Sequence, residues 1–303
     1  DAASLPIAEL ADAARQILES GDAVDLIVPD PDAHAGAWPG ERRPDGAIQR
    51  SWRDWSDLAD ALGARLGTPS RLDRDGPARC RVRLERLPAE APFHLDDDRA
   101  GRYDPGGAFA RLGKMELPGF LLPLRDALRF AAPTPPSSVL IVGCHRGDEI
   151  TALRAAHPHG PDPRIVGVDA NPGALDEARI RHPNATFRQA DARALPSDLG
   201  RFEVIVAVAV LQSPALDGPS VLRALVRDHA TPSGGVVIGL PASRVRGGEI
   251  VWGARTRNFS EVDLSLVVRD LAGHRRYLHQ HGYRTRIGGR YDLLLAGRRD
   301  APG

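Results

Sequence analysis

The sequence predicts an α/β protein in which a small N-terminal α/β unit precedes a larger domain built on a mostly parallel sheet. After residue 138, short β-branched apolar runs alternate with helical segments, an order typical of a parallel sheet covered by helices on both faces. Near the end of the chain, Gly288-Gly289 separates two extended runs and predicts an antiparallel hairpin. A stretch rich in acidic residues, glycine and proline, residues 88–107, separates this part from the first hundred residues.

The first hundred residues mix helical and extended patterns. Apolar residues recur at helical spacing from Ile7 to Leu18, and Ala23 to Val28 predicts a short strand. Pro29 to Gly46 has the composition of a loop. Trp52 to Leu66 predicts an amphipathic helix, and Cys80 to Leu87 alternates with period two, as a half-buried strand does. These patterns predict a small α/β unit over residues 1–100.

The larger domain begins with a predicted helix, Phe120 to Phe130, which ends before the prolines at 133–136. Five β-branched runs then predict its parallel strands: Val139 to Val142, Arg164 to Val168, Thr186 to Gln189, Val204 to Val208 and Val236 to Leu240. Arg284 to Ile287 and Tyr291 to Ala296 predict the hairpin. The sheet is therefore expected to have seven strands.

Length and composition bound the organisation and the class of protein. We expect a linker or lid over residues 101–118 and the larger domain over 119–303. Forty basic and forty acidic residues cancel, so no overall field attracts nucleic acid or an anionic membrane. The arginine bias, with Lys114 as the only lysine, is typical of a GC-rich bacterial genome. Two distant cysteines, Cys80 and Cys144, and no apolar run of about 20 residues predict a reduced, cytoplasmic protein that does not span a membrane.

A glycine turn follows the first parallel strand of the larger domain. Ligands of such sheets bind at the carboxyl ends of the strands, where the first turn must let the backbone approach the ligand. Gly143 and Gly147 permit that approach, and Asp148 and Glu149 open the next helix, whose amino end favours their negative charge. A tight turn without a ligand is the alternative interpretation.

Acidic residues also follow the second and third parallel strands. Asp169 ends the second strand, where a carboxylate can accept hydrogen bonds from both hydroxyls of a ribose. Asp191 follows the third strand and could accept a hydrogen bond from an adenine amino group, while the backbone NH of Ala192 could donate one to the ring. The three features together indicate a nucleoside site.

With these residues, the sequence resembles the class I S-adenosylmethionine (AdoMet) dependent methyltransferases over roughly residues 115–298. Their G-x-G-x-G motif matches Gly143, His145 and Gly147, and their ribose and adenine acids match Asp169 and Asp191. Phe202 to Ala207 is similar to their fourth motif, and the turn at 231–236 is similar to the one before their fifth strand. The resemblance implies a Rossmann-like fold, AdoMet as cofactor, and these cofactor-binding residues: Gly143, Cys144, His145, Gly147, Asp169, Ala170, Asp191, Ala192 and Ala207.

The chain departs from the family pattern at two positions. Ile141 stands where the family often has an acid, and His145 replaces the middle glycine. The nicotinamide fingerprint G-x-G-x-x-G fits less well, because it would need glycine in place of both His145 and Asp148. Asp148 and Glu149 would repel a phosphate, whereas they suit the ammonium group of a methionine moiety.

Catalytic and acceptor-binding residues are harder to predict, because methyl transfer chiefly requires positioning and exclusion of water. If the acceptor loses a proton, the candidate bases are His145, Glu149, His274 and Tyr277. The candidate acceptor-binding residues, which suit an anionic or aromatic small molecule, are Tyr103, Trp252, Arg255 and Arg257. His157-Pro158-His159 has no third ligand nearby in the sequence, so no metal is predicted.

The sequence leaves three alternatives to a small-molecule methyltransferase. An RNA acceptor would suit the arginines after the fifth strand, although the net charge does not indicate it. Ile141 and His145 leave open a cofactor-binding protein without transfer activity. The third alternative is an enzyme that uses the same pocket for decarboxylated or otherwise modified AdoMet. No pattern predicts the oligomeric state.

Overall fold

The computed structural model describes residues 2–33, 38–72, 78–88, 111–213, 215–252 and 264–299. The chain divides into two compact units. The first unit comprises residues 1–91 and 245–251, and the second comprises residues 92–244 and 252–303. Among the described helices, none combines the length and the apolar composition needed to cross a membrane.

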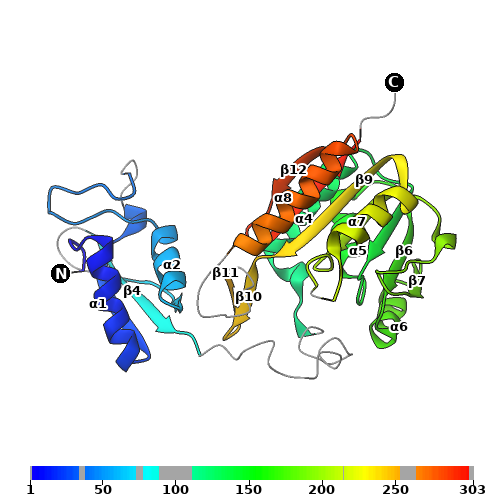
Figure 1. Ribbon diagram of the computed structural model, residues 1–303. Coiled ribbons are helices and arrows are strands. Elements are labelled where there is room, and N and C mark those ends of the chain that lie inside the picture. Colours follow the sequence, from blue (N-terminus) through cyan, green and yellow to red (C-terminus); the bar gives the residue numbers. More distant parts are fainter. Residues whose placement is uncertain are drawn as a thin grey trace. The chain divides into compact units, whose positions relative to one another are not determined.

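The first unit is an antiparallel sheet packed against two helices (Figure 1). Its central strand β4 (Arg79–Arg86) pairs with β1 (Ala23–Pro29), β2 (Ala64–Leu66) and β3 (Ser70–Leu72). The helices are α1 (Ile7–Ser20) and α2 (Trp52–Ala61), and a short 3-10 turn, η1 (Pro31–Ala33), follows β1. Leu10, Trp55, Val82 and Leu84 are among the residues of its buried core. The small α/β architecture expected for this part of the chain is present.

Helix α2 is shorter than the sequence predicted. A capping box between Ser51 and Asp54 starts it, but it ends at Ala61, whereas the prediction ran to Leu66. Gly63 adopts a φ of +63°, a left-handed conformation that ends a helix at low cost. Residues 64–66 then leave the helix direction and form β2, so this part of the prediction was wrong.

A hairpin from the second half of the sequence adds to the first unit. Strands β10 (Ser243–Arg246) and β11 (Glu249–Trp252) pair with each other, and residues 245–251 belong to the first unit. The guanidinium of Arg246 donates hydrogen bonds to the backbone carbonyls of Leu87 and Pro88. No local pattern in the sequence indicates this return of the chain.

The second unit contains a seven-stranded sheet in the order β12-β13-β9-β8-β5-β6-β7 (Figure 1). The bounds of its strands are β5 (Ser138–Val142), β6 (Arg164–Asp169), β7 (Thr186–Gln189), β8 (Phe202–Val208), β9 (Ala230–Pro241), β12 (Arg284–Gly288) and β13 (Asp292–Arg298). The first five of these strands run parallel, and β13 pairs antiparallel with both β9 and β12. The predicted Rossmann-like sheet with its antiparallel hairpin is confirmed.

Helices cover both faces of this sheet. One face packs against α4 (Pro118–Ala131), α5 (Asp148–Ala156) and α6 (Pro172–Arg181). The other face packs against α7 (Gly218–Ala224), the π-helical turn η4 (Leu225–His229) and α8 (Ser265–Gln280). Because both faces are covered, β5 is buried along its whole length, which explains its continuous apolar sequence. The predicted boundaries at residues 100 and 118 stay predictions, and residue 100 lies outside the described residues.

Candidate functional site

The carboxyl ends of three neighbouring strands bring the predicted site together. After β5, the backbone NH groups of Gly143 and Cys144 donate to the carbonyl of Val168 in β6, at 2.8 and 3.1 Å. After β7, the NH of Ala190 donates to the carbonyl of Asp169 at 3.0 Å. These bonds place the glycine turn, Asp169 and the residues leading to Asp191 next to one another along one edge of the sheet.

The turn between β5 and α5 has an unusual backbone. Gly143, His145 and Gly147 have φ angles of +65°, +45° and +82°, so all three occupy the left-handed region. A Cβ at Gly143 would collide with Cγ2 of Val210, and one at Gly147 would lie 2.8 Å from Cδ2 of His182. His145 thus adopts a conformation that costs a residue with a Cβ about 1 kcal/mol. The turn keeps the geometry of three glycines although its middle residue is histidine.

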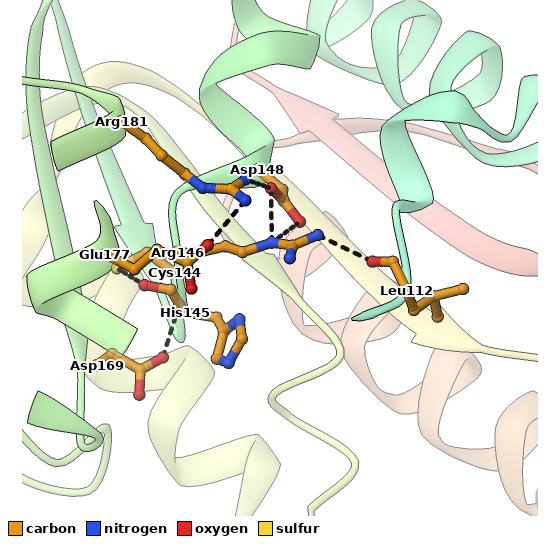
Figure 2. A network of polar contacts seen from close by, with 8 residues as sticks. All are labelled: Leu112, Cys144, His145, Arg146, Asp148, Asp169, Glu177 and Arg181. Atoms are coloured by element: carbon orange, nitrogen blue, oxygen red, sulfur yellow. Dashed lines mark hydrogen bonds and ion pairs between the residues drawn. The ribbon is translucent and has the colours of Figure 1, made fainter. Parts of the chain in front are cut away.

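Asp169 connects the turn to helix α6. Its Oδ2 accepts the backbone NH of His145 at 2.8 Å, and its Oδ1 accepts the NH of Asn171 at 2.9 Å. Asn171 in turn caps α6 by accepting the NH of Ala174 at 3.0 Å. Figure 2 shows that the bond to Asp169 comes from the backbone of His145, whose imidazole extends away from the carboxylate. Each carboxylate oxygen of Asp169 keeps a second lone pair for a ligand.

Asp191 is engaged by a neighbouring arginine. Nε of Arg193 donates to both of its carboxylate oxygens at 3.0 Å, and the backbone NH of Arg193 donates to Oδ1 at 2.8 Å. These hydrogen bonds from Arg193 lower the pKa of Asp191 to about 2. Asp191 and Ala192 are only partly buried, so both remain accessible from solvent. A ligand that uses the Asp191 carboxylate must compete with Arg193.

The two acids at the start of α5 differ in their surroundings. Asp148 accepts hydrogen bonds from Nε of Arg146 at 3.0 Å and from Nη1 of Arg181 at 3.3 Å. The other end of the Arg146 guanidinium donates to the backbone carbonyl of Leu112 at 3.0 Å, as Figure 2 shows. The charge of Asp148 is thus balanced by two arginines.

Glu149 has no such partner. Its Oε2 atom is buried and accepts no hydrogen bond from the part of the chain that the structure describes. The pKa of this carboxyl is raised to about 7, chiefly by burial, with smaller contributions from the negative charges of Asp148 and Asp169. A backbone hydrogen bond of Glu149 itself and the positive charge of Lys114 act in the opposite direction. Glu149 is therefore half protonated near neutral pH, unlike an ordinary exposed glutamate.

The remaining predicted cofactor contacts differ in accessibility. Cys144 is buried, and burial together with the charges of Asp169 and Glu149 raises its pKa, so its thiol stays protonated. Ala170 is exposed, and its carbonyl accepts the side-chain NH of Gln189 at 3.2 Å. Ala207 is fully buried at the end of β8, opposite Val142 in β5. Only its backbone is placed to face a ligand at the edge of the sheet.

The structure places the other predicted residues away from this edge or does not describe them. His274 is buried on α8, where burial lowers its pKa, and Tyr277 stacks on His281 with ring centroids 4.1 Å apart. Helix α8 packs on β9, β12, β13 and α7, not among the elements that flank the turn. Tyr103, Arg255 and Arg257 lie outside the described residues, as does the side chain of Trp252.

Sequence reasoning missed several residues of the site. Arg193 lies two residues after Asp191, and Arg146 is next to His145. In an arginine-rich chain, these positions carried little information. Ala209, just after β8, adopts a φ of +58°, and no sequence pattern indicates a left-handed alanine. Lys114 had a signal that could have been used, since it is the only lysine of the chain.

Residues 139–234 match the family model of a methyltransferase domain. A trans-aconitate 2-methyltransferase from Methylobacterium nodulans is 37% identical over 94 residues, which are 30% of this chain and 33% of that protein. The chain thus matches about a third of the length of this curated relative. The matched family region includes the glycine turn, Asp169 and Asp191.

Two solved structures are similar at low identity. The methyltransferase domain of bacterial CtHen1 is 12% identical, with a TM-score of 0.43 over 59% of this chain and 97% of that one. Magnesium protoporphyrin IX methyltransferase from Synechocystis PCC 6803 is 17% identical, with a TM-score of 0.41 over 60% of this chain and 80% of that one.

Proposed function

Because residues 139–234 match the model of a methyltransferase domain, we propose that this chain is an AdoMet-dependent methyltransferase acting on a small molecule. In this proposal the cofactor binds at the carboxyl ends of β5, β6 and β7. The protein backbone contacts the cofactor through the turn that contains Gly143, Cys144, His145 and Gly147.

The position of Asp169 is the observation that carries the proposal. Its carboxylate is fixed by two backbone NH groups, one of which belongs to the turn, and no cation pairs with it among the described residues. A carboxylate with free lone pairs at this position suits the two vicinal hydroxyls of a ribose. The same two NH bonds orient the carboxylate before a ligand arrives.

The adenine would lie beyond the ribose, between the ends of β6 and β7. Ala170 and Asp191 border that space, and the backbone NH of Ala192 can be donated to the ring. Because Arg193 donates hydrogen bonds to the Asp191 carboxylate, the adenine amino group would have to displace at least one of these Arg193 bonds. The backbone of Ala207 would border the site from β8.

When bound, AdoMet supplies a methyl group on a sulfonium sulfur that is open to displacement by a nucleophile. The chain must hold the acceptor in line with that methyl and exclude water. An acceptor that loses a proton would need a base close to the turn. Glu149, whose pKa is raised to about 7, and His145 are the two candidates on that side. His274 and Tyr277 stay predictions on the other side of the sheet.

The acceptor is proposed to be a small anion. The similar protein from Methylobacterium nodulans is named for a methyl transfer to trans-aconitate, a carboxylate-rich molecule. Arg255, Arg257, Trp252 and Tyr103 remain the proposed acceptor contacts, because guanidinium groups pair with carboxylates. RNA as acceptor, and cofactor binding without transfer, are the competing functions.

Calorimetry and a transfer assay test this function. The full chain is titrated with AdoMet and with S-adenosylhomocysteine, and binding of both with one site per chain is expected. Transfer of a radiolabelled methyl group is then measured with trans-aconitate, related di- and tricarboxylates, and RNA. Failure of a folded chain to bind either nucleoside would refute the methyltransferase assignment. Binding without transfer to any of these acceptors favours the binding protein.

A further inference from the structure

A short segment before helix α4 is held against the glycine turn. The guanidinium of Arg146, buried in the turn, donates to the carbonyl of Leu112. The 3-10 turn η2 (Lys114–Glu116) follows directly and contacts both α4 and α5. Lys114 is thereby placed beside the amino end of α5, close enough to lower the pKa of Glu149 through its charge.

A buried carboxylate fixes the position of Lys114. Its Nζ lies 3.2 Å from Oδ1 of Asp292 at the start of β13, and 4.8 Å from the ring centre of Phe120. The Asp292 side chain is 1% exposed and the Lys114 side chain 27% exposed. An ammonium has three donors, so the bond to Asp292 leaves Lys114 with hydrogen-bonding capacity on its solvent side.

Glu149 supplies the opposite charge next to the same turn. Its buried Oε2 lacks a hydrogen bond among the described residues, and an unsatisfied buried acceptor is costly. Asp148 cannot take the same role, because Arg146 and Arg181 already pair with it. A positive group that reached the turn would therefore find its free acceptor at Glu149.

We propose that Glu149 and Lys114 together hold the amino-acid end of the cofactor, which rests on the proposed function and leaves His145 as the candidate base beside the turn. Oε2 of Glu149 accepts the ammonium of the methionine tail, and Nζ of Lys114 donates to its carboxylate. The pairing is complementary, because a zwitterion meets one residue of each charge. Neither residue belongs to the glycine motif, and Lys114 lies 29 positions before Gly143 in the sequence.

Three nucleosides that differ at the amino-acid end test this proposal. S-adenosylhomocysteine carries both charged groups, its decarboxylated derivative keeps only the amine, and 5′-methylthioadenosine has neither. Their dissociation constants are measured by calorimetry with wild type, Glu149→Gln and Lys114→Met. Glu116→Gln is the matched control, because this exposed carboxyl lies two residues from Lys114. Circular dichroism confirms that each variant is folded.

Each variant should lose affinity for a different subset of the three nucleosides. Glu149→Gln should weaken the two amine-bearing ligands by about tenfold or more, and Lys114→Met should weaken S-adenosylhomocysteine alone by a similar factor. The affinity for 5′-methylthioadenosine should change by less than about twofold in every variant, and Glu116→Gln should change nothing. Equal losses for all three nucleosides, or none, would overturn the inference while the proposed function stands. A folded wild type that binds no nucleoside would overturn both.

Discussion

At the scale of single residues, identical chemical groups in the turn acquire different properties from their neighbours. Asp148 and Glu149 are adjacent in the sequence, and their order suggested only that both favour the amino end of a helix. In the structure, arginines from two other positions pair with Asp148, while the buried Oε2 of Glu149 accepts no hydrogen bond from the described residues. Tertiary contacts decide this difference. The sequence could therefore indicate that the turn is acidic, but not that Glu149 is the acid without an arginine partner.

The raised pKa of Glu149 makes stability depend on pH. The folded value of about 7 lies above the ordinary value of 4.5, so the folded state binds the proton more tightly. The contribution of Glu149 to the free energy of unfolding is therefore constant below about pH 4.5, and it falls as the pH rises from there to about 7. Compared with Glu149→Gln, the wild type should lose about 3 kcal/mol of unfolding free energy over that range. Urea unfolding from pH 4 to 8 measures the difference, and parallel curves would contradict it.

Arg193 should limit the affinity of the adenine end. Arg193→Ala frees the Asp191 carboxylate, so S-adenosylhomocysteine is expected to bind more tightly, by about fivefold at most because the pair is exposed. High salt should reduce the gap between variant and wild type, since salt screens exposed charges. Calorimetry at two salt concentrations provides the comparison. Weaker binding by the variant would mean that Arg193 itself contacts the ligand.

At the scale of elements, the predictable parts were those with a long, uninterrupted pattern. The parallel strands β5, β6, β8 and β9 were predictable because strands buried on both faces have continuous apolar sequences. The edge strand β7, in which Phe187 is the buried residue, has a weaker pattern. The end of α2 was missed, because the apolar spacing of a helix continued through Gly63 into a three-residue strand. The return of residues 245–251 to the first unit was also missed, since contacts so distant in sequence leave no local pattern.

Arg146 links two elements, the turn before α5 and the segment that leads into α4. Arg146→Ala removes a buried guanidinium bonded to Asp148 and Leu112, so we expect a loss of about 2 kcal/mol in unfolding free energy. Arg181→Ala, the control, removes the more exposed partner of the same Asp148 and should cost less than about 1 kcal/mol. Chemical denaturation of both variants distinguishes these values. Equal costs would mean that the bond to Leu112 contributes nothing.

At the scale of the whole molecule, the proposed cofactor contacts lie in the second unit, while the first unit has its own buried core. The described residues of the first unit hold no cluster of His, Cys, Asp and Glu that could bind a metal. Mutations can nevertheless test the two units independently. A change in the core of one should leave ligand binding by the other intact.

Trp55→Ala tests that independence. Trp55 is 1% exposed in the core of the first unit, and its truncation should cost about 3–5 kcal/mol of that unit's stability. The affinity for S-adenosylhomocysteine should stay within about twofold of wild type at a temperature where the variant is folded. Scanning calorimetry and isothermal titration measure the two effects. A large loss of affinity would place part of the cofactor site in the first unit.

The most direct test of the central claim is the affinity of Asp169→Ala for S-adenosylhomocysteine, compared with wild type and Asp176→Ala. Asp176 is an exposed aspartate on α6, close in sequence, and its carboxylate pairs with Arg179 at 2.6 Å. If Asp169 binds the ribose, its variant should lose at least about tenfold in affinity, while Asp176→Ala binds as wild type does. An unchanged dissociation constant for a folded Asp169→Ala would contradict the assignment of the nucleoside to the ends of β5, β6 and β7.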